Sequence, residues 1–257
     1  MPKEGVAIVA DLHTNSLAGI RPAKVFRDDA TPVLLNKASR WLLHTWERNW
    51  SEVLSWLDGV DTRTLIINGD AVDVDAKGRT TRVISRNPAN VKTMTVDLLE
   101  PIVKEFDRVF VIRGTESHVG GSGYIEELVA DDLEAEPDKE TGNHSWWHLR
   151  AMFAGVRFDI AHHMTMGTLP WTYSTAPARY AFETEVQYTV EWQEQVPDVV
   201  IRSHIHRYSD SGTTRPVRVF STPCWQFVPP YMMRKGKYNE RPHFGSLAFI
   251  CEDGNYK

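Results

Sequence analysis

Short apolar runs that end in polar residues recur along the first half of the chain. They are GVAIVAD at residues 5–11, TLIINGD at 64–70 and RVFVIRG at 108–114. Runs of this length, rich in Val and Ile and bounded by Gly or Asp, are typical of strands that are buried on both faces. The pattern therefore predicts three buried strands in this part of the chain.

Between these runs the spacing of apolar residues changes to that of helices. Residues from about 34 to 57 are expected to form a long amphipathic helix that ends at Asp58 and Gly59. Residues 93–106 predict a second helix, in which Pro101 marks either a kink or a late start. The apolar stripe of the first helix, which is expected to pack on the core, consists of Leu42, Trp46, Trp50, Val53 and Leu57.

The second half of the chain is richer in predicted strands. A helix is also expected near residues 180–192, and the polar segment 134–143 is expected to be a surface loop. Strands alternate with helices, and no internal repeat or clear linker divides the chain, so the order predicts one layered α/β domain over residues 1–257. The later strands are expected at 156–163, 198–204, 217–223 and 244–252.

Composition narrows the possible classes only a little. The chain is 42% hydrophobic and 25% charged, as in ordinary globular proteins, and its formal net charge of -5 gives no overall attraction to nucleic acid. Cys224 and Cys251 have neither the density of a disulfide framework nor metal-binding spacing, so both are expected to be reduced thiols in the core. The N-terminal apolar run is too short for a signal peptide or a membrane span, which predicts a cytoplasmic protein without a membrane partner.

Histidines and carboxylates gather at the ends of the predicted strands, where six of the ten histidines fall. Strand ends of open α/β sheets open onto one crevice, so these side chains are expected to converge. Each alone has an ordinary explanation as a helix cap, a turn residue or a core histidine, but five coinciding strand ends predict a site. The residues are Asp11 and His13, Asp70 and Asp73, Glu116 and His118, His162 and His163, and His204 and His206.

This mixture of imidazoles and carboxylates is typical of a metal site. Without cysteine ligands it suits Zn²⁺, Mn²⁺ or iron, as Fe²⁺ or Fe³⁺. The set is larger than the four ligands of one zinc ion, which predicts two divalent ions. Two ions about 3.5–4 Å apart, bridged by a carboxylate, can bind the attacking and leaving oxygens of a phosphoryl transfer.

The ordered set DLH, GDAVD, GTESH, AHH and SHIH resembles the calcineurin-like metallophosphoesterase family. That family has Asp-x-His, Gly-Asp-x-x-Asp, Gly-Asn-His-Asp/Glu, a strand-end His and Gly-His-x-His. The resemblance runs from residue 11 to residue 206 and implies a two-sheet β-sandwich flanked by helices. It implies that Asp70 bridges two metal ions. The other implied ligands are Asp11, His13 and His206 for one ion, and His162 and His204 for the other.

The sequence departs from the family pattern at GTESH. Thr115 stands where the family has an Asn ligand, and we expect Glu116 to supply the missing oxygen and His118 to act as general acid. Asp73 is expected either to orient His118 or to cap a helix. Because alternate strand residues share a side, His162 is favoured as ligand over His163. A bulge in the strand would reverse this assignment.

The expected activity is hydrolysis of a phosphomonoester or phosphodiester by hydroxide formed on the metal ions. Arg113 and Arg207 could bind phosphate oxygens, although surface ion pairs are the commoner use. A metal-dependent nuclease acting on DNA or RNA is an alternative, based on the basic segment 232–241. The tryptophans outside the helix stripe could stack on bases or pack in the core; they are Trp146, Trp147, Trp171 and Trp225. A third alternative is a scaffold that keeps the fold without catalysis. The sequence leaves the substrate, the metals and the oligomeric state open.

Overall fold

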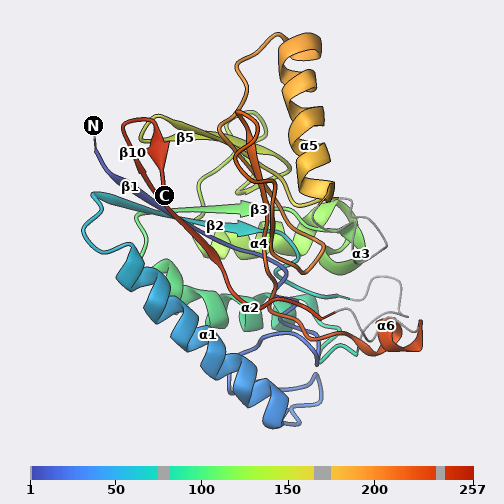
Figure 1. Cartoon of the computed structure of the whole chain (residues 1–257). Helices are drawn as coiled ribbons and strands as arrows, with labels where there is room; N and C mark the ends of the chain where they lie inside the picture. Colours follow the sequence, from blue (N-terminus) through green and yellow to red (C-terminus); the bar gives the residue numbers. More distant parts are fainter. Residues whose placement is uncertain (1, 75–81, 165–174, 236–240) are drawn as a thin grey trace.

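Two β-sheets pack face to face, and helices cover their outer faces (Figure 1). The computed structural model describes residues 2–74, 82–164, 175–235 and 241–257. Within these ranges the first sheet has six strands in the order β11-β10-β1-β2-β3-β4. They are β1 (Glu4–Val9), β2 (Thr62–Asn68), β3 (Arg108–Ile112), β4 (Ser145–Trp146), β10 (Leu247–Glu252) and β11 (Asn255–Tyr256).

The apolar strands of the first sheet are buried on both faces, as their sequences predict. In β1, Val6 and Ile8 face the second sheet, whereas Ala7 and Val9 face the helices. Strands β1, β2 and β3 are parallel neighbours, and β10 runs antiparallel beside β1. Because β1, β2 and β3 point the same way, their carboxyl ends lie at one edge of the sheet.

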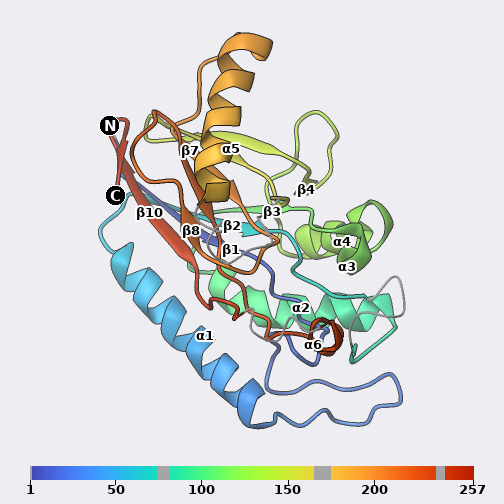
Figure 2. The same cartoon turned by 45° about the vertical axis from the view of Figure 1, so that its right-hand side comes forward.

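Three helices cover the outer face of this sheet: α1 (Lys37–Trp56), α2 (Pro88–Val103) and α4 (Tyr124–Asp132). Figure 2 shows α1 and α2 on the side of the strands opposite α5. The long helix predicted at 34–57 is confirmed, with its start fixed by Asn36, whose side chain accepts a hydrogen bond from Ser39 N. Trp46 and Trp50 are buried in the core, as predicted.

Helix α2 begins earlier than the apolar spacing indicates. The side chain of Asn87 accepts a hydrogen bond from Ala89 N, and Pro88 occupies the first turn, where a missing N–H costs nothing. The predicted start at residue 93 was therefore wrong, because the cap at Asn87 sets the start of the helix and the buried stripe already begins at Val91. Pro101 lies in the last turn of the helix and does not mark a late start.

The second sheet has five strands in the order β5-β6-β7-β9-β8 among the described residues. Its central strands β6, β7 and β9 are parallel, so their carboxyl ends also share one edge. Phe158 of this sheet packs against Phe249 of the first, which makes the two sheets one α/β unit with a common core. The strands are β5 (Leu149–Phe153), β6 (Val156–Ile160), β7 (Val199–Arg202), β8 (Ser209–Asp210) and β9 (Arg218–Ser221).

Helix α5 (Thr175–Val186) covers the outer face of the second sheet, where Ala181 packs near Val219. The helix predicted at 180–192 is present, but α5 begins five residues earlier and continues as a π-helix, η3 (Gln187–Trp192). Pro177 in the first turn is compatible with that earlier start.

The remaining expectations concern the surface and the thiols. Segment 134–143 is largely exposed, as expected for a surface loop, and Cys224 and Cys251 are free and buried. Within the described ranges, no helix is long and apolar enough to cross a bilayer. The short helices not yet given are α3 (Glu116–Val119), η1 (Gly121–Gly123) and α6 (Pro230–Arg234).

Candidate metal centre

The carboxyl ends of strands from both sheets meet, and Asn68 at the end of β2 joins them. Its side-chain N–H groups donate to Ser203 Oγ at 2.6 Å and to Ala161 O at 3.2 Å, so the loops after β6 and β7 are fixed against β2. The loop after β1 is fixed in the same way, because Asp11 N donates to Gly69 O at 2.9 Å.

Several residues in these loops have left-handed backbone conformations, which non-glycine residues rarely adopt. Such conformations cost on the order of 1–3 kcal/mol each and concentrate at functional sites. Five of the predicted site residues have them, although none is glycine. Their φ angles are 54° at Asp11, 48° at His13, 51° at Asp70, 73° at His204 and 57° at His206. The strained turns aim these side chains into one space.

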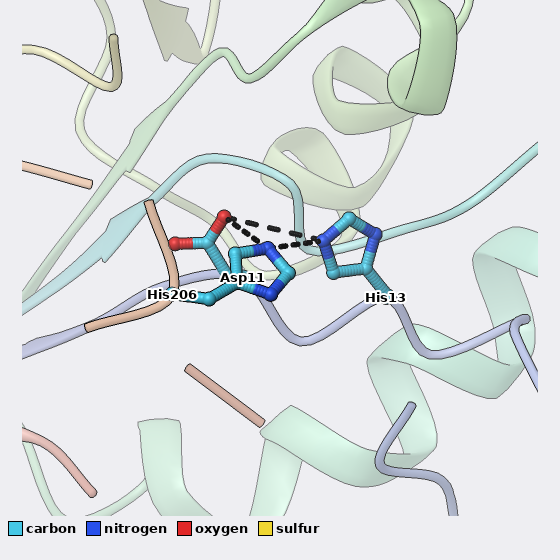
Figure 3. Close-up of side chains that lie close together, drawn as sticks. All are labelled: Asp11, His13 and His206. Carbon is cyan, nitrogen blue, oxygen red and sulfur yellow. Dashed lines mark hydrogen bonds and ion pairs between the residues drawn. The ribbon is translucent and has the colours of Figure 1, made fainter. Parts of the chain in front are cut away.

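Asp11, His13 and His206 form one group of ligand atoms (Figure 3). Asp11 Oδ1 lies 3.2 Å from His206 Nε2 and 4.0 Å from His13 Nε2. The two Nε2 atoms are themselves 3.2 Å apart. The three atoms therefore surround one position from the loops after β1 and β7.

Asp70, His162 and His204 form a second group, which shares no residue with the first. Asp70 Oδ2 lies 3.2 Å from His162 Nε2. His162 Nδ1 donates to Asn68 O at 2.8 Å, since a carbonyl can only accept. This hydrogen bond fixes the orientation of the ring, so that Nε2 points toward Asp70 and the centre of the site.

Asp70 belongs to the second group but also lies close to the first. Its Oδ2 atom is 3.9 Å from His13 Nε2 as well as close to His162, and its Oδ1 accepts from Thr115 N at 2.6 Å. Gly69 and Gly114 allow this approach. A Cβ atom at Gly69 would lie 2.4 Å from His162 Nδ1, and one at Gly114 would lie 2.2 Å from Asp70 Oδ1.

Asp73 and His118 lie at the border of the cluster. Asp73 Oδ2 is 3.4 Å from His118 Nδ1 and 3.6 Å from His13 Nδ1, so one buried carboxylate faces both imidazoles. Burial lowers the pKa of His118, but the hydrogen bond to Asp73 and the charge of Asp70 outweigh it and raise that pKa above the usual value. A ligand atom of His118 also lies within 4.8 Å of one from Asp70 and one from His13.

The structure does not bring Glu116 into this cluster. Glu116 is the exposed first residue of α3, and its Oε1 accepts from Ser122 N at 3.4 Å. Thr115 is the residue that faces the site, because its Oγ1 lies 3.0 Å from His204 Nδ1. His163 is exposed and lies 3.4 Å from the same hydroxyl, whereas its neighbour His162 is buried.

Arg113 is held away from a phosphate-binding role by its contacts. Its guanidinium donates to Glu127 at 3.1 Å and to Ser145 Oγ at 2.7 Å, and the side chain is nearly buried. Trp225 is fully buried in the core, where it packs on Trp46. Trp171 and residues 236–240 of the basic segment lie outside the described residues.

Glu126 is a buried carboxyl that the sequence analysis missed, together with the helix α4 that carries it. Its Oε1 accepts from Ala71 N at 2.9 Å and its Oε2 from Gly114 N at 2.6 Å. Burial and the nearby charge of Asp70 raise the pKa of Glu126 to about 7, against the opposing effect of the two N–H groups. Its position next to Ile125, three and four residues before Val129 and Ala130, was the available signal of a buried position.

The donor set fits a divalent cation. Among the described residues, Asp11 Oδ1 and His162 Nε2 are buried and make no hydrogen bond of regular geometry, although His206 Nε2 and Asp70 Oδ2 respectively lie 3.2 Å from them. Burial lowers the pKa of His162, but the charge of Asp70 outweighs it and raises that pKa to about 9. The carboxylates thus stabilise positive charge in the cluster. Acceptor atoms of carboxylate and imidazole suit Zn²⁺, Mn²⁺ and iron.

No protein-family model matches the chain, and no curated protein matches its sequence at a significant level. Among solved structures, vacuolar protein sorting 29 from Cryptosporidium parvum is 12% identical, with a TM-score of 0.42, over 100% of this chain and 96% of that one. Vps29 complexed with Zn²⁺ from Entamoeba histolytica is 12% identical, with a TM-score of 0.41, over 98% and 96%. The phosphopantetheinyl hydrolase PptH from Mycobacterium tuberculosis is 10% identical, with a TM-score of 0.38, over 92% and 93%. At these similarities the function has to be argued from the site itself.

Proposed function

We propose that the chain is a metal-dependent phosphoesterase of the calcineurin-like metallophosphoesterase family with a dinuclear site. One observation carries the proposal: two groups of three ligand atoms share no residue, and Asp70 Oδ2 of the second group lies 3.2 Å from His162 Nε2 and 3.9 Å from His13 Nε2 of the first group. An oxygen in that position suits a bridging carboxylate. The ordered motifs DLH, GDAVD, AHH and SHIH supply the same residues that the family resemblance implies.

The assignment of ligands follows the two groups. Asp11, His13 and His206 would hold one ion, His162 and His204 would hold the other, and Asp70 would bridge them. Two divalent ions supply Lewis-acid chemistry: they lower the pKa of a water molecule and neutralise charge on phosphate oxygens. No ligand role is assigned to Glu116, since its carboxylate is exposed and Thr115 takes the position beside His204.

His118 is proposed to donate the proton that the leaving oxygen requires. Asp73 Oδ2 lies 3.4 Å from His118 Nδ1 and forms an ion pair with the protonated ring, which orients the ring and leaves Nε2 for proton transfer. Asp73 acts through His118 and is therefore a positioning residue.

The test combines metal content with turnover. Purified protein is expected to bind about two divalent ions per chain, as a dinuclear site requires, and to hydrolyse bis(p-nitrophenyl) phosphate or p-nitrophenyl phosphate with added Mn²⁺. Asp70→Asn should lose both bound metal and turnover, while Asp97→Asn, an exposed carboxylate on α2, should keep both. Protein that binds no metal and turns over no ester would support the scaffold alternative instead. Turnover of DNA with salt-dependent affinity would favour the nuclease.

A further inference from the structure

A cavity of about 450 Å³ lies beside the second group of candidate ligands. Its wall includes Thr115, whose hydroxyl lies 3.0 Å from His204 Nδ1, and His163, which contacts the same hydroxyl at 3.4 Å. The volume is within the range of small-molecule sites, roughly 300–1,000 Å³. Its lining residues are Gly114, Thr115, Glu116, Ser117, Trp147 and His163.

Trp147 supplies an aromatic wall to this cavity. The side chain is 50% exposed, and the residue directly follows β4. The guanidinium of Arg113 lies 5.2 Å from the ring centroid. Arg113 is itself held by Glu127 and Ser145, so the indole rests on a fixed support. A ring that is already ordered loses little conformational entropy when a ligand stacks on it.

The polar groups that line the cavity determine which ligand charge it can accept. Glu116 contributes an exposed carboxylate, and Thr115 and Ser117 contribute hydroxyls. A carboxylate repels a second phosphate and accepts hydrogen bonds from N–H or O–H donors. The cavity therefore suits a neutral group that is flat, apolar on its faces and rich in donors at its edge.

Resting on the proposed phosphoesterase function, we propose that this cavity binds the nucleobase of a nucleoside phosphate whose phosphoryl group lies at the metal centre. The base stacks on the free face of Trp147, and Glu116 accepts a hydrogen bond from an exocyclic amino group. The shared wall formed by Thr115 and His163 connects the two subsites. A substrate with one phosphate and an aromatic base satisfies both.

The first test measures binding without catalysis. Adenosine 5′-monophosphate and ribose 5-phosphate are titrated into EDTA-treated protein by calorimetry or ligand-observed NMR. The two ligands share the ribose and the 5′-phosphate and differ at C1, which carries adenine in one and a hydroxyl in the other. One stacked base corresponds to binding about 5- to 150-fold tighter. We expect that preference in the wild-type protein. Equal affinities for the two ligands would overturn the proposal.

Substitutions test which residues cause the preference for adenosine 5′-monophosphate over ribose 5-phosphate. Trp147→Ala is expected to abolish it, Trp147→Phe to retain most of it, and Glu116→Gln to weaken it for adenosine 5′-monophosphate alone. Trp56→Ala is the matched control, because Trp56 is 51% exposed and lies at the end of α1, away from the site. A preference unchanged in Trp147→Ala would place the base elsewhere and reject the assignment. Glu116→Gln and Trp147→Phe provide the comparison if Trp147→Ala does not fold.

The same ligands separate this proposal from the proposed enzyme activity. If turnover is absent while the Trp147-dependent preference persists, the phosphoesterase proposal fails and the base subsite stands. If esters are hydrolysed but the KM ratio of glycerol phosphate to adenosine 5′-monophosphate is the same in wild type and Trp147→Ala, the enzyme stands and the subsite fails.

Discussion

The carboxylate of Glu126 accepts a 2.6 Å hydrogen bond from the backbone N–H of Gly114. Its other oxygen accepts from Ala71 N at 2.9 Å. Gly114 lies in the loop after β3 and Ala71 follows Asp70 in the loop after β2, so one buried side chain of α4 joins two loops of the candidate metal centre. Because Thr115 N donates to Asp70 in turn, the two loops are connected at adjacent positions.

Loss of this carboxylate should destabilise the protein. Glu126→Ala leaves two buried N–H groups without an acceptor, at about 1–3 kcal/mol each. We expect the free energy of unfolding to fall by roughly 2–6 kcal/mol, measured by urea denaturation of EDTA-treated protein. Glu47→Ala, on the exposed face of α1, is the control. A loss below about 0.5 kcal/mol would be that of an ordinary surface substitution and would contradict a structural role.

A methyl group added at position 114 should disrupt the metal centre, whereas a methyl group added at position 121 should not. Gly114→Ala places a Cβ atom 2.2 Å from Asp70 N and from Asp70 Oδ1, where neither a buried backbone atom nor the carboxylate can move freely. Gly121→Ala is the matched control, because no heavy atom lies within 4 Å of its added Cβ. We expect Gly114→Ala to bind less metal by elemental analysis and Gly121→Ala to bind the wild-type amount. Equal metal content in both variants would show that the loop adapts.

Replacement of His118 should affect leaving groups unequally. A general acid contributes roughly 10²- to 10⁴-fold, but p-nitrophenolate leaves without full protonation. We therefore expect His118→Gln to lower kcat strongly for an alkyl phosphate and much less for p-nitrophenyl phosphate. Elemental analysis provides the control, since His118 is also within reach of Asp70 and His13 as a ligand. Equal losses accompanied by reduced metal content would make His118 a ligand and not the acid.

The strand ends were the part of the site that the sequence could predict. Asp11, Asp70 and His204 each follow an apolar run, and parallel strands bring such ends together whatever the details of packing. The alternation of side chains likewise distinguished His162 from His163, because Phe158 and Ile160 on the same side of β6 are buried.

The parts that the sequence could not predict depend on contacts made far along the chain. Glu116 and Thr115 are adjacent, and only the turn into α3 decides that Thr115 faces His204. Glu126 belongs to a short helix whose apolar stripe is interrupted by the carboxylate itself. Its partners, Ala71 and Gly114, are backbone groups, which carry no sequence signal.

A buried ion pair between β6 and β7 allows a prediction about the pH dependence of stability. Asp159 of β6 lies 2.7 Å from Arg202 of β7 and 2.9 Å from His148. Burial raises the pKa of Asp159, but the hydrogen bond from His148 and the charge of Arg202 outweigh it and hold that pKa well below 3.8. A carboxylate with a lowered pKa stabilises the fold above its unfolded value, and this contribution is lost as the pH falls through the folded value.

Asp159→Asn should therefore lower the free energy of unfolding by roughly 3–5 kcal/mol at pH 7, because it leaves Arg202 buried without its charged partner. Urea denaturation of EDTA-treated protein from pH 7 to pH 3 is the measurement. The difference between wild type and variant should stay constant down to about pH 4, near the model-peptide value for Asp, and then shrink, since only the wild-type protein loses the ionised carboxylate. Asp97→Asn, which has an exposed side chain, should follow the wild-type curve throughout. A difference independent of pH down to pH 3 would mean that packing and hydrogen bonding by Asp159, and not its charge, stabilise β6 against β7.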